Sequence, residues 1–165
     1  MHTRALRLCF LVFLVCALSV SLGSDLRAEH RLKERRLDDA TLQKMVDKLR
    51  QDLSILEVVG VTIVPDNPLM VSVETVSGRG GPFMISVDES FMSELTDDEM
   101  NSALAHELGH VWIYTHHPYL QTEKLANTIA MRAVTRASLV PVYYKVWERL
   151  GTKGDLNEFL GDGQQ

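Results

Sequence analysis

Residues 97–114 read DDEMNSALAHELGHVWIY and contain two histidines four positions apart, His106 and His110. Apolar residues recur along this stretch at the spacing of a helix. Thr96 followed by Glu99 is a capping box, which predicts that the helix begins just before its acidic first turn. Because residues four apart lie on the same face of a helix, His106 and His110 can bind one metal ion together.

Glu107 lies between these histidines and completes an H-E-x-x-H motif. It directly follows His106, so its carboxylate can reach the mouth of a metal site without being a ligand. A carboxylate in that place can act as general base on a zinc-bound water. The sequence therefore predicts a zinc hydrolase with one Zn²⁺ per chain, in which His106 and His110 are ligands and Glu107 is catalytic. The alternative is a pair of surface or core histidines that bind no metal.

Catalytic zinc requires a third protein ligand, and two residues compete for this role. His116 follows His106 by ten residues, as in the metzincin pattern, but Ile113 replaces the glycine that breaks the helix there. Glu123 lies in a second predicted helix, where Asn127 is one turn further along on the same face. The Asn127 side chain could accept a hydrogen bond from the outer N–H of a ligand histidine. We favour Glu123, because a ligand and its orienting partner explain two residues together, and His116 is the alternative.

These two segments resemble a known family of zinc metallopeptidases. HELGH at 106–110 followed by EKLANTIA at 123–130 is similar to the gluzincin pattern, H-E-x-x-H followed by E-x-x-A-[ND]-x-x-A. The resemblance is greatest to ImmA/IrrE-like peptidases and to minigluzincins, and it extends over about residues 84–134. It implies that the zinc ligands are His106, His110 and Glu123, with Glu107 as base and Asn127 as partner of a ligand histidine.

The N-terminal segment 1–23 has the features of a secretory signal peptide. Arg4 and Arg7 precede an uncharged apolar run that ends in small residues. The run is short for a membrane span, and an uncleaved anchor is the alternative. Both cysteines, Cys9 and Cys16, lie in this segment, so the mature chain would have neither disulfides nor cysteine ligands. We expect a secreted or periplasmic protein with no stable membrane partner unless the segment stays uncleaved.

Composition and charge characterise the chain beyond the signal segment. We expect a basic linker at 24–37, one domain at 38–151 and a loosely ordered polar tail at 152–165. The chain has 17 Lys and Arg against 22 Asp and Glu, a net charge of −5. This acidic balance argues against nucleic acid and leaves a protein or peptide substrate as the expected partner. The sequence carries no signal for an oligomeric state.

The pattern of apolar residues and turn signals predicts an α+β fold of the small zincin-like type. We expect three strands that form an antiparallel or mixed sheet, connected as a meander. The expected order is an N-terminal helix from Asp38 or Asp39 to about residue 56, strands at 58–64, 69–76 and 83–87, the H-E-x-x-H helix, and C-terminal helices at 122–136 and 141–150.

Together these features predict an exported zinc-dependent endopeptidase that hydrolyses peptide bonds with a zinc-bound water activated by Glu107. His116, His117 and Tyr119 lie between the two metal-bearing helices and are candidate hydrogen-bond donors to the oxyanion. By the resemblance, strand 83–88 is expected to bind an extended substrate as an added strand. The alternatives are a zinc-dependent hydrolase of a non-peptide amide, such as cell-wall material, and a non-catalytic zinc-binding interaction module. The intact Glu107 argues against the last of these.

Overall fold

The computed structural model describes residues 37–77, 81–116 and 118–162. The predicted signal peptide at 1–23, the basic linker up to residue 36, and His117 lie outside the described residues. The described helices and strands lie in one compact unit, which begins at Asp38. Within the described part of the chain, none of the helices combines the length and the apolar character needed to cross a membrane.

Helix α2 (Asp39–Asp52) opens this unit. Its N-cap is Asp38, whose side chain accepts the backbone N–H of Thr41 at 2.8 Å. The helix ends earlier than residue 56, because Ser54 adopts a left-handed φ of 57° and the Ile55 N–H then bonds back to the Arg50 carbonyl at 2.9 Å. A stripe of buried residues on one face consists of Leu42, Val46 and Leu49.

The sheet contains the strands β1 (Val59–Val64), β2 (Val71–Thr75) and β3 (Phe83–Asp88) in the order β1-β3-β2. Strand β1 is parallel to β3, and β2 is antiparallel to β3. The predicted α+β fold with a three-stranded mixed sheet is confirmed. The predicted meander is wrong, because β3 lies between the two strands that precede it in sequence.

The loop between β1 and β2 explains this order. The Asn67 N–H donates to Asp88 Oδ2 at 3.0 Å, and its side-chain amide donates to the Ser86 carbonyl at 2.9 Å and to Ser72 Oγ at 3.1 Å. These bonds hold the loop against the C-terminal end of β3. Met70 then takes a positive φ of 64°, and β2 runs back along β3 instead of along β1.

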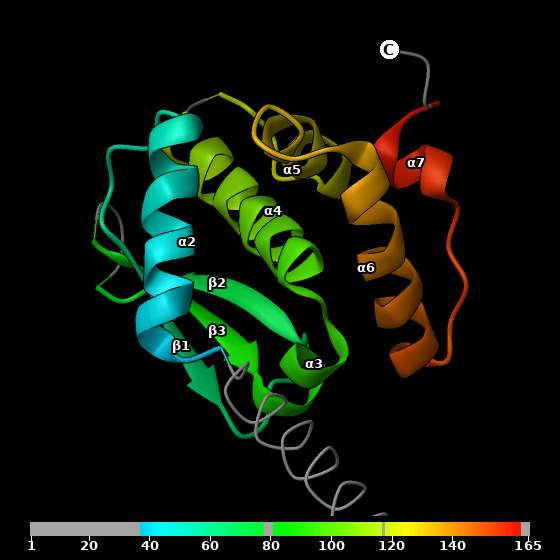
Figure 1. Cartoon of the computed structure of the whole chain (residues 1–165). Coiled ribbons are helices and arrows are strands. Elements are labelled where there is room, and N and C mark those ends of the chain that lie inside the picture. The colour runs from blue at the N-terminus through cyan, green and yellow to red at the C-terminus, as the bar shows by residue number, and fades with distance from the viewer. Residues whose placement is uncertain (1–36, 78–80, 117, 163–165) are drawn as a thin grey trace, which may run out of the picture. The chain divides into compact units, whose positions relative to one another are not determined.

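Helix α4 (Asp97–Thr115) is the central element, and the short helix α3 (Glu89–Glu94) connects it to β3. Figure 1 shows α2 and α4 side by side over one face of the sheet, and the helices that follow α4 in the sequence lie on its far side from α2. Because α4 contacts α2, the sheet, α5 and α6, its buried residues are not confined to one narrow stripe. The H-E-x-x-H motif is therefore surrounded by packed elements on several sides.

Helix α5 (Glu123–Ala130) is shorter than the predicted helix at 122–136. It begins at the N-cap Thr122, whose hydroxyl accepts the Leu125 N–H at 3.2 Å. It stops at Ala130 because Thr135 is already the N-cap of the next helix and has extended backbone angles. Turns at 131–134 connect the two helices.

Helix α6 (Arg136–Leu150) begins before the predicted start at residue 141. The Thr135 hydroxyl accepts the Ser138 N–H at 3.1 Å and supplies the cap. Pro141 therefore lies inside the helix, where it removes one N–H donor from the backbone ladder. The cap outweighs the proline as the signal for where this helix begins.

The predicted loosely ordered tail at 152–165 contains a further helix, α7 (Leu156–Leu160). Asp155 caps it by accepting the Asn157 N–H at 2.8 Å, and Leu160 is buried. Helix α7 contacts α5 and α6, so this helix packs on the domain through Leu160, while most other described residues of the segment are exposed.

We expect Glu99→Ala to lower the free energy of unfolding by about 1–3 kcal/mol. The Glu99 carboxylate accepts the Thr96 N–H and the Lys145 ammonium, each at 2.6 Å, and so joins the start of α4 to α6. Chemical denaturation measures the loss. The control is Asp98→Ala, since Asp98 is exposed in the same turn and its loss is expected to change stability by less than about 1 kcal/mol.

The same contact makes stability depend on pH. Burial alone would raise the pKa of Glu99, but hydrogen bonds from Lys145 and Thr96 outweigh burial and hold the pKa below its ordinary value of 4.5. The stabilisation is therefore present above that value and is lost as the pH falls through the folded-state pKa. Equal acid sensitivity of the wild type and Glu99→Ala would contradict this assignment.

Candidate metal centre

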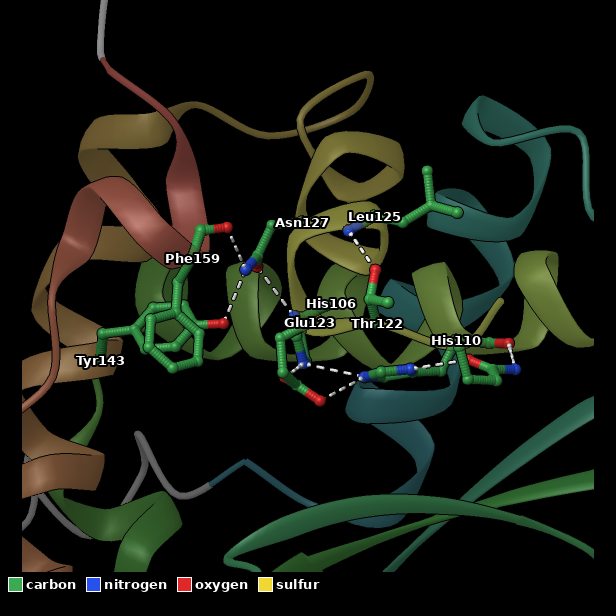
Figure 2. A network of polar contacts seen from close by, with 9 residues as sticks. His106, His110, Thr122, Glu123, Leu125, Asn127, Tyr143 and Phe159 are labelled. Atoms are coloured by element: carbon green, nitrogen blue, oxygen red, sulfur yellow. Dashed lines mark hydrogen bonds and ion pairs between the residues drawn. The ribbon is translucent and has the colours of Figure 1, made fainter. Parts of the chain in front are cut away.

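The side chains of His106 and His110 on α4 and of Glu123 at the start of α5 converge on one point (Figure 2). The two histidine Nε2 atoms are 3.2 Å apart. The Glu123 carboxylate lies 3.1 Å from the first Nε2 and 3.4 Å from the second. Among the residues that the structure describes, these three form the group of His, Cys, Asp and Glu side chains able to hold a metal ion.

A glycine makes this convergence possible. A Cβ at Gly109 would lie 2.9 Å from the Cα of Ala126 and would overlap its carbonyl oxygen. The missing side chain therefore allows α5 to cross α4 at short distance, which places Glu123 beside the histidines. Our sequence analysis assigned Gly109 no role. The sequence did contain a signal for Gly109, because glycine inside a helix is about 1 kcal/mol less favourable than alanine. A glycine in the middle of a predicted helix therefore suggests close packing against a neighbouring element.

Asn127 determines which nitrogen of His106 carries the proton. The Asn127 Nδ2 donates to the Tyr143 hydroxyl at 2.6 Å and to the Phe159 carbonyl at 3.0 Å. Its Oδ1 therefore faces His106 Nδ1, at 2.8 Å, and accepts a hydrogen bond from it. With the proton on Nδ1, Nε2 presents a bare lone pair to Glu123. The predicted pairing of Asn127 with a ligand histidine corresponds to this contact.

Gln121 does the same for His110. Its Nε2 donates to the His110 carbonyl at 3.1 Å, and its Oε1 accepts from His110 Nδ1 at 3.0 Å. In the neutral imidazole of His110, Nε2 then also carries no proton and has a free lone pair. Our sequence analysis missed Gln121, because it precedes α5 and has no fixed spacing from the H-E-x-x-H motif.

Two lone pairs and a carboxylate that face one another attract a proton or a metal ion. When an imidazole carries a proton on Nε2, His106 and then His110 can donate it to the Glu123 carboxylate, and this interaction lowers the pKa of Glu123 well below its usual range. Burial disfavours charge on His110, but its hydrogen bonds with Glu123 and Gln121 outweigh burial and raise its pKa. Both shifts have the direction expected where positive charge is favoured at the centre of the group.

The group fits zinc in both chemistry and size. Two imidazole nitrogens and one carboxylate oxygen are the donor set of catalytic zinc sites that keep one position open. Ligands about 2.0–2.1 Å from a tetrahedral zinc are about 3.3–3.4 Å apart. The separations of 3.1, 3.2 and 3.4 Å between His106, His110 and Glu123 agree with this value.

Glu107 lies next to this group without belonging to it. Its side chain is buried, and its carboxylate lies near the backbone N–H of Val73 on β2. Burial raises the pKa of Glu107, and the nearby imidazoles of His106 and His110 oppose this shift without cancelling it. A carboxylate with a raised pKa is better suited to take up and release protons near neutral pH.

The metal centre opens on a cleft of about 700 Å³ between β2, α4 and α6. Three carboxylates line it, those of Glu74, Glu107 and Glu123. Most other lining side chains are apolar, including Val71, Phe83, Phe91, Leu139 and Val142. A ligand of this cleft would therefore contact apolar walls beside a negatively charged centre.

The sequence analysis expected strand 83–88 to bind an extended substrate. In the structure this strand is β3, and the edge strand beside the cleft is β2. Strand β3 pairs with β1 on one side and with β2 on the other, so it has no free edge over its paired residues. On the side of β2 that faces β3, the Met70 carbonyl accepts the Asp88 N–H, and the Val76 N–H donates to the carbonyl of Pro82, just before β3. The alternate residues between them, among them Val73, direct their backbone groups away from β3. Of the two edge strands, β1 and β2, it is β2 that lines the cleft, so its edge is the one at which an added strand would cross the metal centre.

Two of the three candidate oxyanion donors, His116 and Tyr119, lie away from the cleft. His116 is the C-cap of α4, with its Nδ1 2.8 Å from the Trp112 carbonyl and its ring stacked on Trp112 at 3.9 Å. Tyr119 is exposed and also packs against Trp112. Neither residue lines the cleft, and His116 is not part of the metal group. His117 is outside the described residues.

Tyr143 on α6 lines the cleft and was missed by our sequence analysis. Its ring lies edge-on to that of His106, with centroids 6.2 Å apart, and burial raises its pKa to about 12. Its hydroxyl is therefore protonated at neutral pH. Sequence spacing offered no signal for Tyr143, because only the packing of α6 against α4 brings it to the site.

No protein-family model matches the chain, and no curated protein matches it either. Among solved structures, the chain is similar to the metallopeptidase zymogen of Pyrococcus abyssi abylysin, with 18% sequence identity and a TM-score of 0.48. The similarity covers 69% of this chain and 99% of that chain. At this level of similarity, the function must be derived from the chain's own site.

Proposed function

We propose that this chain is an exported zinc-dependent endopeptidase. The observation that carries the proposal is the convergence of His106, His110 and Glu123 beside the buried carboxylate of Glu107, at the floor of a cleft. A structural zinc site has no use for a base at this place, whereas a hydrolase requires one. The signal-like composition of residues 1–23 supports export.

The role of each residue follows from its contacts. Zinc held by His106, His110 and Glu123 would supply Lewis acidity and lower the pKa of a coordinated water. Glu107 takes a proton from the attacking water and delivers it to the leaving amine, a role for which burial has raised its pKa. Asn127 and Gln121 keep both histidine Nε2 atoms free of protons.

The free edge of β2 supports a peptide as substrate. An extended peptide can pair with the backbone groups of β2 that point away from β3 and thereby cross the cleft beside Glu107. The Val73 N–H lies on this edge, close to the Glu107 carboxylate. The apolar walls of the cleft would accept the peptide's apolar side chains. These features favour a peptide over a non-peptide amide.

Removal of metal tests the proposal. We expect the purified chain to contain about one zinc and to cleave an unfolded, fluorescently labelled protein. Dialysis against a chelator should abolish cleavage, and zinc added back should restore it where magnesium does not. Rates are read from fluorescence and metal content from atomic emission. Cleavage by the metal-free chain would exclude a metallopeptidase, and zinc binding without cleavage would favour the interaction module.

A further inference from the structure

We propose that helix α7 (Leu156–Leu160) is part of the metal centre, because its Phe159 carbonyl fixes the tautomer of His106 through Asn127. Figure 2 shows this relay, with Phe159 and Tyr143 on one side of Asn127 and His106 on the other. The inference rests on the proposed zinc site. It assigns a positioning role to a segment that contributes no metal ligand.

The relay begins at the carbonyl because a carbonyl oxygen can only accept hydrogen bonds. Phe159 therefore requires the NH₂ group of Asn127 on its side, at 3.0 Å. The amide oxygen must then face His106 Nδ1, at 2.8 Å, which requires the proton there. The consequence is a bare Nε2, the atom that faces Glu123 and would bind zinc.

The opposite orientation of the Asn127 amide would favour a protonated His106 Nε2, which cannot bind a metal ion. Its oxygen would face the Phe159 oxygen, and its NH₂ would face His106 Nδ1. That contact would favour the tautomer with the proton on Nε2, where the metal must bind. The Tyr143 hydroxyl can donate or accept, so it is compatible with both orientations. Phe159 is therefore the partner that decides between them.

Asn127 is completely buried, so its amide has only one favourable orientation. Its side chain has 0% exposure, so water cannot replace a lost partner. A buried amide group without a partner carries a substantial free-energy cost. The amide is therefore held in the one orientation that satisfies Phe159, Tyr143 and His106 together.

Tertiary packing holds the carbonyl in place. A helix of five residues is not stable alone, so α7 depends on its contacts. The Phe159 ring packs against Tyr143 and Trp147, with centroids 5.3 and 5.9 Å apart. Leu160 is 4% exposed, and Arg136 Nη2 donates to the Gly161 carbonyl at 3.2 Å. Substitutions in α7 can thus loosen the relay without changing any residue of α4 or α5.

The test is zinc affinity of the full chain, measured by competition with a chromogenic chelator. Phe159→Ala and Leu160→Ala should each weaken zinc binding by about 10- to 100-fold, the range seen when groups that orient metal ligands are lost. Phe159→Leu keeps apolar packing and should recover most of the affinity. Val46→Ala, in the buried face of α2, is the control that lowers stability without reaching the site.

A second measurement separates positioning from general loosening. Imidazole nitrogen shifts of the zinc-free chain should show His106 with its proton on Nδ1 in the wild type and a mixture of tautomers in Phe159→Ala. Folded α7 variants that keep this tautomer and bind zinc within about twofold of wild type would overturn the inference, since the expected loss is at least about tenfold. Failure of the wild-type chain to bind zinc would instead overturn the proposed function, and the relay with it.

Discussion

Replacing Glu107 by Gln is expected to slow peptide cleavage by about 10²- to 10⁴-fold while zinc remains bound. Glutamine has nearly the same shape as glutamate but cannot accept a proton from the attacking water. The loss should appear in the rate constant at saturating substrate, because Glu107 acts on the reacting atoms and not on the remainder of the peptide.

The surroundings of Glu107 explain why this substitution is a clean test. The Glu107 side chain is buried, so a residue of different shape would disturb the packing around it. Glutamine has nearly the same shape and leaves this packing unchanged. The amide also keeps an oxygen that can accept a hydrogen bond, as the carboxylate does. His106, His110 and Glu123 keep their positions, because none of them is held in place by Glu107 in the contacts that define the metal group.

The matched control is Glu74→Gln. Glu74 also lines the cleft, from β2, but it is exposed and is not part of the metal group. Both substitutions remove one negative charge from the cleft, and only Glu107→Gln should abolish cleavage. Initial rates and zinc content are measured for both variants. Equal losses would point to the charge of the cleft, and an active Glu107→Gln would exclude Glu107 as base.

Features encoded by neighbouring residues could be predicted from the sequence. The start of α4 depends on Thr96 and Glu99, three residues apart, and the capping box forms as expected. The grouping of Glu123 with the histidines followed from helical spacing within α4 and α5 combined with the resemblance. One turn of helix is short enough that spacing alone determines which side chains share a face.

Features that depend on long-range contacts could not be predicted. The order of the strands depends on Asn67 bonding to Asp88, and no local pattern encodes that contact. The polar composition of residues 152–165 concealed α7, whose stability comes from Phe159 packing on α6. Tyr143 reaches the site by the same packing. These errors share one cause, because tertiary partners override local propensity and composition.

Replacing Gly109 by Ala is expected to lower the free energy of unfolding by about 1–3 kcal/mol and to weaken zinc binding by about 10- to 100-fold. Helix propensity predicts the opposite sign, since alanine favours a helix by about 1 kcal/mol over glycine. Packing decides, because the new Cβ would lie 2.9 Å from the Ala126 Cα and overlap its carbonyl. This obstacle is backbone, which cannot rotate away as a side chain can.

The cost should reach the metal centre because α5 is the element that must move. Ala126 and Glu123 lie on this helix, so displacing one from α4 draws the other away from His106 and His110. Thermal unfolding and zinc competition measure the two effects. Ser102→Ala on α4 is the control, since the buried Ser102 hydroxyl has no hydrogen-bond partner within the described structure and its loss should not destabilise the chain. A Gly109→Ala chain as stable as wild type, with full zinc affinity, would show that α5 does not need this close crossing to deliver Glu123.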